Sequence, residues 1–198
     1  MSFAVAELEL PVRIRPLKPM SEEELLRFCA ANEGLRIERE PDGELVIMTP
    51  AGGESNRREV FIARELDFWA EESGNGVAYG STAGFNLPDG SMLSPDAAWV
   101  SSERWLALTP EQRERLLPFC PDFVVEVLSR SDSPSALRAK MEQWMRNGAQ
   151  LGWLFDPYAA TLAIYRPGKQ PEILHKPDSI EAEAPIAGFR LTLGRIWA

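Results

Sequence analysis

The sequence predicts an α/β fold of mixed type, in which a central mixed β-sheet is flanked by helices. Two observations support this expectation. Stretches with helical spacing alternate along the chain with short apolar stretches that are typical of strands. One of the latter, "FVVEVL" at residues 123–128, is apolar enough to be buried on both faces. Further strand-like stretches follow it, so we also expect extra C-terminal strands.

The chain is expected to form a single domain over residues 1–198, with residues 1–20 as an N-terminal extension. A chain of 198 residues that is 44% apolar can bury one sizeable core without covalent staples. Cys29 and Cys120 lie far apart and match no metal-ligand spacing. We expect them to be small buried apolar residues and not a disulfide, as in a reducing compartment.

The first elements expected are a helix and a β-hairpin. In "SEEELLRFCAANEG", Ser21 stands three residues before Glu24, a capping box that predicts a helix over 22–33. The turn signal "PDG" at 41–43 then separates "LRIERE" from "ELVIMTP", a pattern that predicts a β-hairpin.

A second helix is expected over about 55–73, because large apolar residues recur there at helical spacing. Its charged residues are expected on a solvated face where arginine pairs with glutamate: Arg57, Arg58 and Arg64 with Glu54, Glu59 and Glu65. The next segment, 77–101, is rich in glycine and small residues, with "LPDG" at 87–90 near its middle. We expect a pair of strands joined by that turn.

The remaining elements are expected in the order two short helices, strand, helix and three strands. Thr109 opens the second short helix with a capping box. The buried strand at 123–128 follows, and then a helix from about Pro134 to Asn147. "LGWLFDP", "TLAIYRP" and "EILHKP" predict the final three strands, of which the last is an edge strand.

Composition excludes several classes of function. The net charge of −9 argues against a protein that coats nucleic acid nonspecifically, because such proteins are usually basic. A single histidine, His175, makes a Ser-His-Asp triad and a zinc site improbable. No apolar run approaches the roughly 20 residues that span a bilayer, and the first residues show no secretion signal. We therefore expect a cytoplasmic protein without a membrane partner.

Three polar residues stand out because their neighbours are apolar. Glu126 lies inside the buried strand, and Asp96 in "SPDAAWV" stands at the start of another apolar strand. On a helical wheel of about 100° per residue, Lys140 borders the apolar stripe of the helix that follows Glu126. An acid at a strand start, an acid within a strand and a lysine on a covering helix can meet in one cleft.

Such a cluster is suited to metal-assisted hydrolysis of phosphodiesters. Two carboxylates a few Å apart repel each other unless a cation lies between them. Mg²⁺ prefers oxygen ligands and takes one or two carboxylates together with several waters. A bound divalent ion can lower the pKa of its water, and an adjacent lysine can orient that water or stabilise the pentavalent anion.

Each of the three residues also has a purely structural interpretation. "PD" is a turn signal that recurs four more times in the chain, so Asp96 can belong to a turn. Lys140 can extend its ammonium group to solvent from the edge of its helix. Glu126 can form a buried ion pair with Lys140 and do nothing more.

The stretch 84–157, from "GFNLPDGSMLSPDAAWV" through "FVVEVLS" to "KMEQWMRNGAQLGWLFDP", resembles the signature of the Uma-two family. This family is labelled as restriction endonucleases and placed in the PD-(D/E)XK nuclease-like superfamily. The resemblance extends upstream through "ELVIMTPAGGESNRREVFIARELDFWAEE" and downstream to "GFRLTLGRIW", and covers most of the chain from about residue 20.

The resemblance implies a restriction-endonuclease-like fold with Asp96 and Glu126 in the active site. It also implies that a metal ion is bound by these two carboxylates and by the main-chain carbonyl of Val127. The superfamily's usual lysine stands two residues after the glutamate, where this chain has Leu128. Lys140 is the natural substitute for that lysine.

The leading hypothesis is therefore an endonuclease that depends on Mg²⁺ or Mn²⁺ and hydrolyses DNA, with Asp96, Glu126 and Lys140 as catalytic residues. Many enzymes of this kind act as symmetric dimers, so a homodimer is expected. The alternative is a catalytically silent nuclease fold that binds nucleic acid or protein partners; the net charge and the missing lysine at Leu128 favour it. A third option is metal-dependent chemistry on a smaller phosphate substrate.

Overall fold

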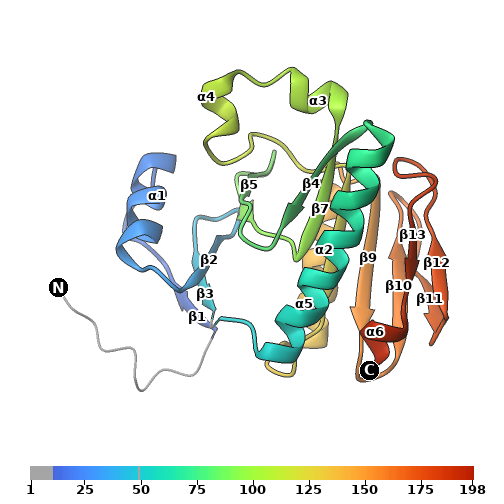
Figure 1. The fold of residues 1–198 in the computed structure, drawn as a ribbon. Helices are drawn as coiled ribbons and strands as arrows, with labels where there is room; N and C mark the ends of the chain where they lie inside the picture. Colours follow the sequence, from blue (N-terminus) through green and yellow to red (C-terminus); the bar gives the residue numbers. More distant parts are fainter. Residues whose placement is uncertain (1–10, 49) are drawn as a thin grey trace.

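The computed structural model describes residues 11–48 and 50–198, which form three β-sheets and six helices (Figure 1). The largest sheet has six strands in the order β11-β10-β9-β8-β7-β4. β8 and β9 pair in parallel, while the other neighbours in this sheet are antiparallel, so the sheet is mixed as predicted. Its strands are β4 (Gly76–Gly80), β7 (Ala97–Ser101), β8 (Phe123–Val127), β9 (Leu151–Asp156), β10 (Thr161–Tyr165) and β11 (Glu172–His175).

A five-stranded sheet with the order β1-β3-β2-β6-β5 lies beside the large sheet, and helix α1 (Glu22–Ala31) packs with it (Figure 1). This small sheet carries the predicted hairpin. Its strands are β1 (Val12–Ile14), β2 (Arg36–Arg39), β3 (Leu45–Met48), β5 (Phe85–Asn86) and β6 (Met92–Leu93). A third sheet pairs β12 (Ser179–Glu181) with β13 (Arg190–Thr192) near the C-terminal helix α6 (Gly194–Trp197).

Two helices cover opposite faces of the large sheet. Helix α2 (Gly53–Ser73) packs its buried apolar residues against Phe123 and Val125 of β8. Helix α5 (Pro134–Arg146) packs against the other face, which includes Val124. Because side chains alternate between the faces of a strand, Glu126 points to the face that α5 covers. This placement brings Glu126 toward the residues of α5.

Most of the predicted elements are confirmed. The capping box of Ser21 and Glu24 opens α1, and Thr109 caps the short helix α4 (Pro110–Arg113), which follows α3 (Ser102–Leu106). The hairpin, both long helices, the buried strand and the strands after it lie within a few residues of their predicted bounds.

The expected pair of strands joined by the turn at 87–90 is present as β5 and β6, but it accounts for only part of residues 77–101. The segment contains four strands, because the chain leaves the large sheet after β4, contributes β5 and β6 to the small sheet, and returns as β7. The loop at 81–84 allows the first crossing, and Pro95, which has no N–H to donate, lies at the second. Strands β12 and β13 and helix α6 had no recognisable sequence signal, since each has only three or four residues.

Among the described residues, no helix is long and apolar enough to cross a membrane.

Close packing between β4 and β7 provides a test of the fold. A Cβ atom on Gly76 would lie 2.3 Å from the ring of Trp99, which is buried in the core that α2 covers. We expect Gly76→Ala to lower the free energy of unfolding by about 1–3 kcal/mol, because the ring must move within a packed core. Urea denaturation followed by circular dichroism measures this change.

Gly80→Ala is the matched control, because it changes the other end of the same strand. A Cβ atom there meets no atom within 4 Å, so we expect a change within about 0.5 kcal/mol. Equal effects of the two substitutions would contradict the packing of β4 on Trp99.

Candidate active site

The structure brings Asp96, Glu126 and Lys140 together. Asp96 directly precedes β7, Glu126 lies in the neighbouring strand β8, and Lys140 lies on α5. Both acids are almost fully buried, with 5% of Asp96 and 2% of Glu126 exposed. The grouping expected from the sequence is therefore present where β7 begins and β8 ends, beside α5.

The Asp96 carboxylate is held by two donors. Its Oδ2 accepts a hydrogen bond of 2.8 Å from the main-chain N–H of Val127, the residue after Glu126. Its Oδ1 accepts a hydrogen bond of 3.0 Å from the guanidinium group of Arg36. Asp96 therefore has specific partners in the site, which a simple turn residue would not need.

Lys140 and Trp144 both contact the same carboxylate oxygen of Glu126. Oε1 lies 2.9 Å from the ammonium nitrogen of Lys140 and accepts a hydrogen bond of 2.8 Å from the indole N–H of Trp144. Neither of these contacts uses Oε2. Trp144 is a fully buried core residue, and its indole N–H also fixes the orientation of Glu126.

Lys140 does not extend to solvent. Its ammonium group donates hydrogen bonds of 2.8 Å to Glu38 Oε1 and 2.9 Å to the carbonyl oxygen of Ser94. Together with Glu126, these groups surround a side chain that is only 14% exposed. The position at the border of the apolar stripe thus places Lys140 inside the site.

Sequence reasoning missed Arg36 and Glu38, both of which belong to β2 of the small sheet. They are two residues apart, so their side chains lie on the same face of the strand. Glu38 is buried and also accepts a hydrogen bond of 3.1 Å from the N–H of Ser94. The alternation in "LRIERE" was available as a signal, but only the fold shows that this face of β2 turns toward Asp96.

Glu59 was also missed, and the expected solvated face of α2 is partly wrong. Arg57 pairs with Glu54 at the surface as predicted, but Glu59 and Arg58 are buried, with 6% and 8% exposed. Arg58 donates hydrogen bonds to carbonyl oxygens of the C-terminal helix α6 and the residue after it. For Arg58 the physical reason is that the C-terminal segment covers this part of α2, which the sequence pattern of α2 alone does not reveal.

Burial governs the protonation of the acids. It raises the pKa of Glu126 to about 7, with repulsion from Asp96 adding to this effect and Lys140 acting against it. Burial also raises the pKa of Glu59 to about 7, again with a contribution from Asp96. Burial acts to lower the pKa of Lys140, but the carboxylates of Glu126 and Glu38 outweigh it, so the pKa rises and the ammonium stays charged.

The site has more acids than bases. Asp96 repels both Glu59 and Glu126, and Glu126 is also repelled by Glu38, while Arg36 and Lys140 supply the cationic charge near these four carboxylates. When all are ionised, two negative charges remain uncompensated in a poorly hydrated site. An additional divalent cation would remove this excess, and the carboxylate donors are of the kind that Mg²⁺ and Mn²⁺ prefer.

The number of protein ligands for such an ion is small. Among residues 11–48 and 50–198, no three or more His, Cys, Asp and Glu side chains are arranged to hold a metal ion. An ion at the cluster would therefore have to be held by fewer than three of these side chains. Mg²⁺ accepts such a set because it retains several waters.

Position 128, two residues after Glu126, is apolar in this chain. Leu128 is 6% exposed and lines a hollow of about 140 Å³ with Leu154 and Ala163.

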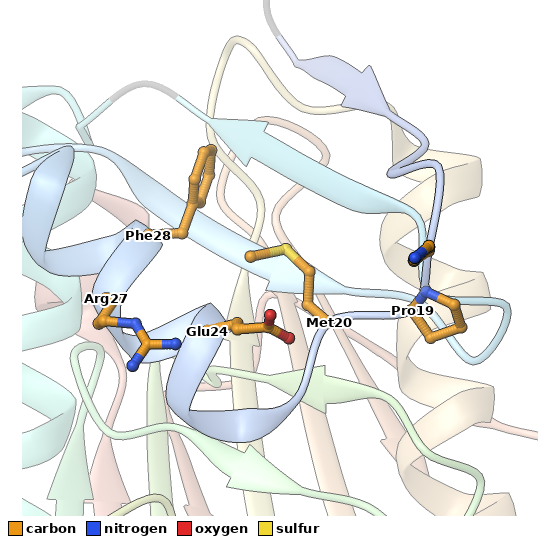
Figure 2. A pocket seen from close by; sticks show the side chains of 6 residues that line it. Pro19, Met20, Glu24, Arg27 and Phe28 are labelled. Atoms are coloured by element: carbon orange, nitrogen blue, oxygen red, sulfur yellow. The ribbon is translucent and has the colours of Figure 1, made fainter.

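A larger hollow of about 380 Å³ lies beside α1, where residues such as Met20 and Phe28 line it (Figure 2). None of its lining residues belongs to the acidic cluster, so it does not form part of the candidate site.

The fold is similar to the crystal structure of a protein from Anabaena variabilis ATCC 29413, described as a "putative nuclease belonging to DUF820", with a TM-score of 0.72 and 19% sequence identity. The match covers 90% of this chain and 98% of the other, so the two proteins share one fold.

The model of the Uma2 family, described as "Putative restriction endonuclease", matches residues 22–194. The chain belongs to this family. No curated protein matches the chain.

The raised pKa of Glu59 predicts a specific dependence of stability on pH. Its folded value of about 7 exceeds the ordinary value of 4.5, so folding favours the protonated form. This stabilisation is fully present below about pH 4.5 and is lost as the pH rises through about 7. We expect the unfolding free energy of the wild type, relative to Glu59→Gln, to fall by more than about 1 kcal/mol between about pH 5 and about pH 8.

Urea denaturation across this pH range measures the difference. Glu54→Gln is the control, because Glu54 lies on the same helix but is exposed. If Glu59→Gln and Glu54→Gln have the same pH profile, Glu59 does not have the raised pKa.

Proposed function

We propose that this protein is an endonuclease that hydrolyses DNA phosphodiester bonds with the help of Mg²⁺ or Mn²⁺. In this proposal Asp96, Glu126 and the main-chain carbonyl of Val127 bind the ion. The observation that carries the proposal is the meeting of two buried carboxylates and a charged lysine from three separate elements. Membership of the Uma2 family and the nuclease-like fold support the same reaction class.

The residues of the chain have distinct parts in this reaction. A divalent ion, when bound, lowers the pKa of a coordinated water and offsets the charge of the phosphodiester. Asp96 and Glu126 hold it in a fixed place because Val127 and Trp144 orient their carboxylates. Lys140 keeps its proton, and its ammonium group orients the attacking water or stabilises the anionic transition state.

Isothermal titration calorimetry with MnCl₂ tests the ion site. We expect saturable binding by the wild type and binding at least about tenfold weaker in Asp96→Asn and Glu126→Gln, since each loses a charged ligand. Glu142→Gln is the matched control, because Glu142 lies on α5 at the surface and pairs only loosely with Arg146. Absence of saturable Mn²⁺ binding by the wild type would contradict the proposal.

Cleavage assays then test the chemistry. We expect supercoiled plasmid to be cut in the presence of Mn²⁺, with activity lost in Asp96→Asn and reduced by about 10²-fold or more in Lys140→Ala. Hydrolysis of bis(p-nitrophenyl) phosphate without plasmid cleavage would instead indicate a smaller phosphate substrate. Undiminished cleavage by both variants would show that the assigned residues are wrong.

A silent binding module is the second candidate function, and one observation favours it. Both cations of the cluster already have partners within the chain, because Lys140 pairs with Glu126 and Glu38 and Arg36 pairs with Asp96. Such a network can serve stability or specificity of folding alone. Wild-type protein that neither binds Mn²⁺ nor cleaves any phosphodiester, yet retains a DNA or protein partner, would establish this function.

A further inference from the structure

The guanidinium group of Arg36 binds the carboxylate of Asp96, which is also a ligand of the metal ion in the proposed function. Its Nη1 donates a hydrogen bond of 3.0 Å to Asp96 Oδ1, and its Nη2 donates one of 2.5 Å to the carbonyl oxygen of Ser94. Nη2 also lies 3.9 Å from Glu38 Oε1. The guanidinium group thus takes part of the role of counter-ion to the acidic cluster.

The hydrogen-bonding capacity of the Arg36 guanidinium group is not fully used. Its Nε is buried and has no hydrogen-bond partner among the described residues. A buried N–H without an acceptor is rare and carries a free-energy cost, because it has lost its contact with water. The side chain is 25% exposed, so it has a route outward from its contact with Asp96. These two features distinguish Arg36 from Lys140, whose side chain is 14% exposed and whose ammonium group has three acceptors.

Electrostatics makes Arg36 and a divalent ion competitors. A cation next to Asp96 weakens the binding of a second cation to the same carboxylate by direct repulsion. It also removes part of the negative charge that attracts the ion. The repulsion is strong at this site because the neighbouring acids are buried and water screens it poorly.

We propose that Arg36 is a resident counter-ion of the site, which a divalent metal ion must displace from Asp96 in order to bind. Arg36 therefore sets the metal affinity of the protein and offsets part of the negative charge of the acidic cluster when metal is scarce. This inference rests on the proposed function, since it requires a metal ion at Asp96 and Glu126.

Calorimetric titration with MnCl₂ of the wild type, Arg36→Met and Arg39→Met tests the inference. Arg39 lies on the same strand and donates to Gly90, Met20 and Asn86, none of which belongs to the cluster. Its substitution therefore measures the general effect of removing one positive charge from β2. We expect Arg36→Met to bind Mn²⁺ about tenfold or more tightly than the wild type, and Arg39→Met to stay within about twofold.

Thermal unfolding gives a second readout that does not depend on activity. Arg36→Met leaves Asp96 without its guanidinium partner, so we expect a lower Tm without metal and a larger rise in Tm on adding Mn²⁺ than in the wild type. Arg36→Gln keeps a hydrogen-bond donor without the charge. If Arg36→Met does not fold, Arg36→Gln replaces it in both measurements, with tighter Mn²⁺ binding than the wild type again expected.

The outcomes separate the inference from the proposed function. If the wild type binds Mn²⁺ and the Arg36 variants bind it equally well or more weakly, Arg36 does not compete with the ion and the inference is overturned. If neither the wild type nor an Arg36 variant binds Mn²⁺, the proposed metal site itself is absent and both fail. Tighter binding by Arg39→Met to the same degree as by Arg36→Met would reduce the effect to net charge and also overturn the inference.

Discussion

The arrangement of the site depends on one buried cation, the ammonium group of Lys140. It contacts Glu38 from β2, Glu126 from β8 and the carbonyl oxygen of Ser94, two residues before Asp96. A buried charge must be paired and hydrogen-bonded to be tolerated, and these three acceptors meet that requirement. Because they come from separate parts of the chain, Lys140 also fixes the small sheet, the large sheet and α5 relative to one another at this point.

The small sheet is consequently part of the site and not only an addition to the domain. Its strand β2 supplies Glu38, which stabilises Lys140, and Arg36, which binds Asp96. Two side chains on the same face of β2 thus act on different members of the cluster, because Glu38 contacts the lysine and Arg36 contacts the aspartate. A site built in this way can be rigid around Lys140 while the counter-ion of Asp96 is exchanged.

The sequence predicted those parts of the fold and the site that have strong local signals. Capping boxes, glycine and proline turns and apolar periodicity located most helices and strands, and polar residues among apolar neighbours identified Asp96, Glu126 and Lys140. Glu38, Arg36 and Glu59 were not found, because each lies in a segment whose charged residues look like an ordinary solvated face. Their burial results from contacts between segments distant in the sequence, such as Arg58 with the C-terminal helix, and local patterns contain no information on these contacts.

Anomalous diffraction from crystals grown with MnCl₂ tests whether Asp96 and Glu126 form one metal site. We expect a manganese peak next to one oxygen of Asp96, one oxygen of Glu126 and the carbonyl oxygen of Val127, with Lys140 still in contact with Glu38. Coordination distances should be close to about 2.1–2.2 Å, slightly longer than the distances typical of Mg²⁺. A map with no peak between these carboxylates at saturating manganese, with Arg36 still bound to Asp96, would contradict it.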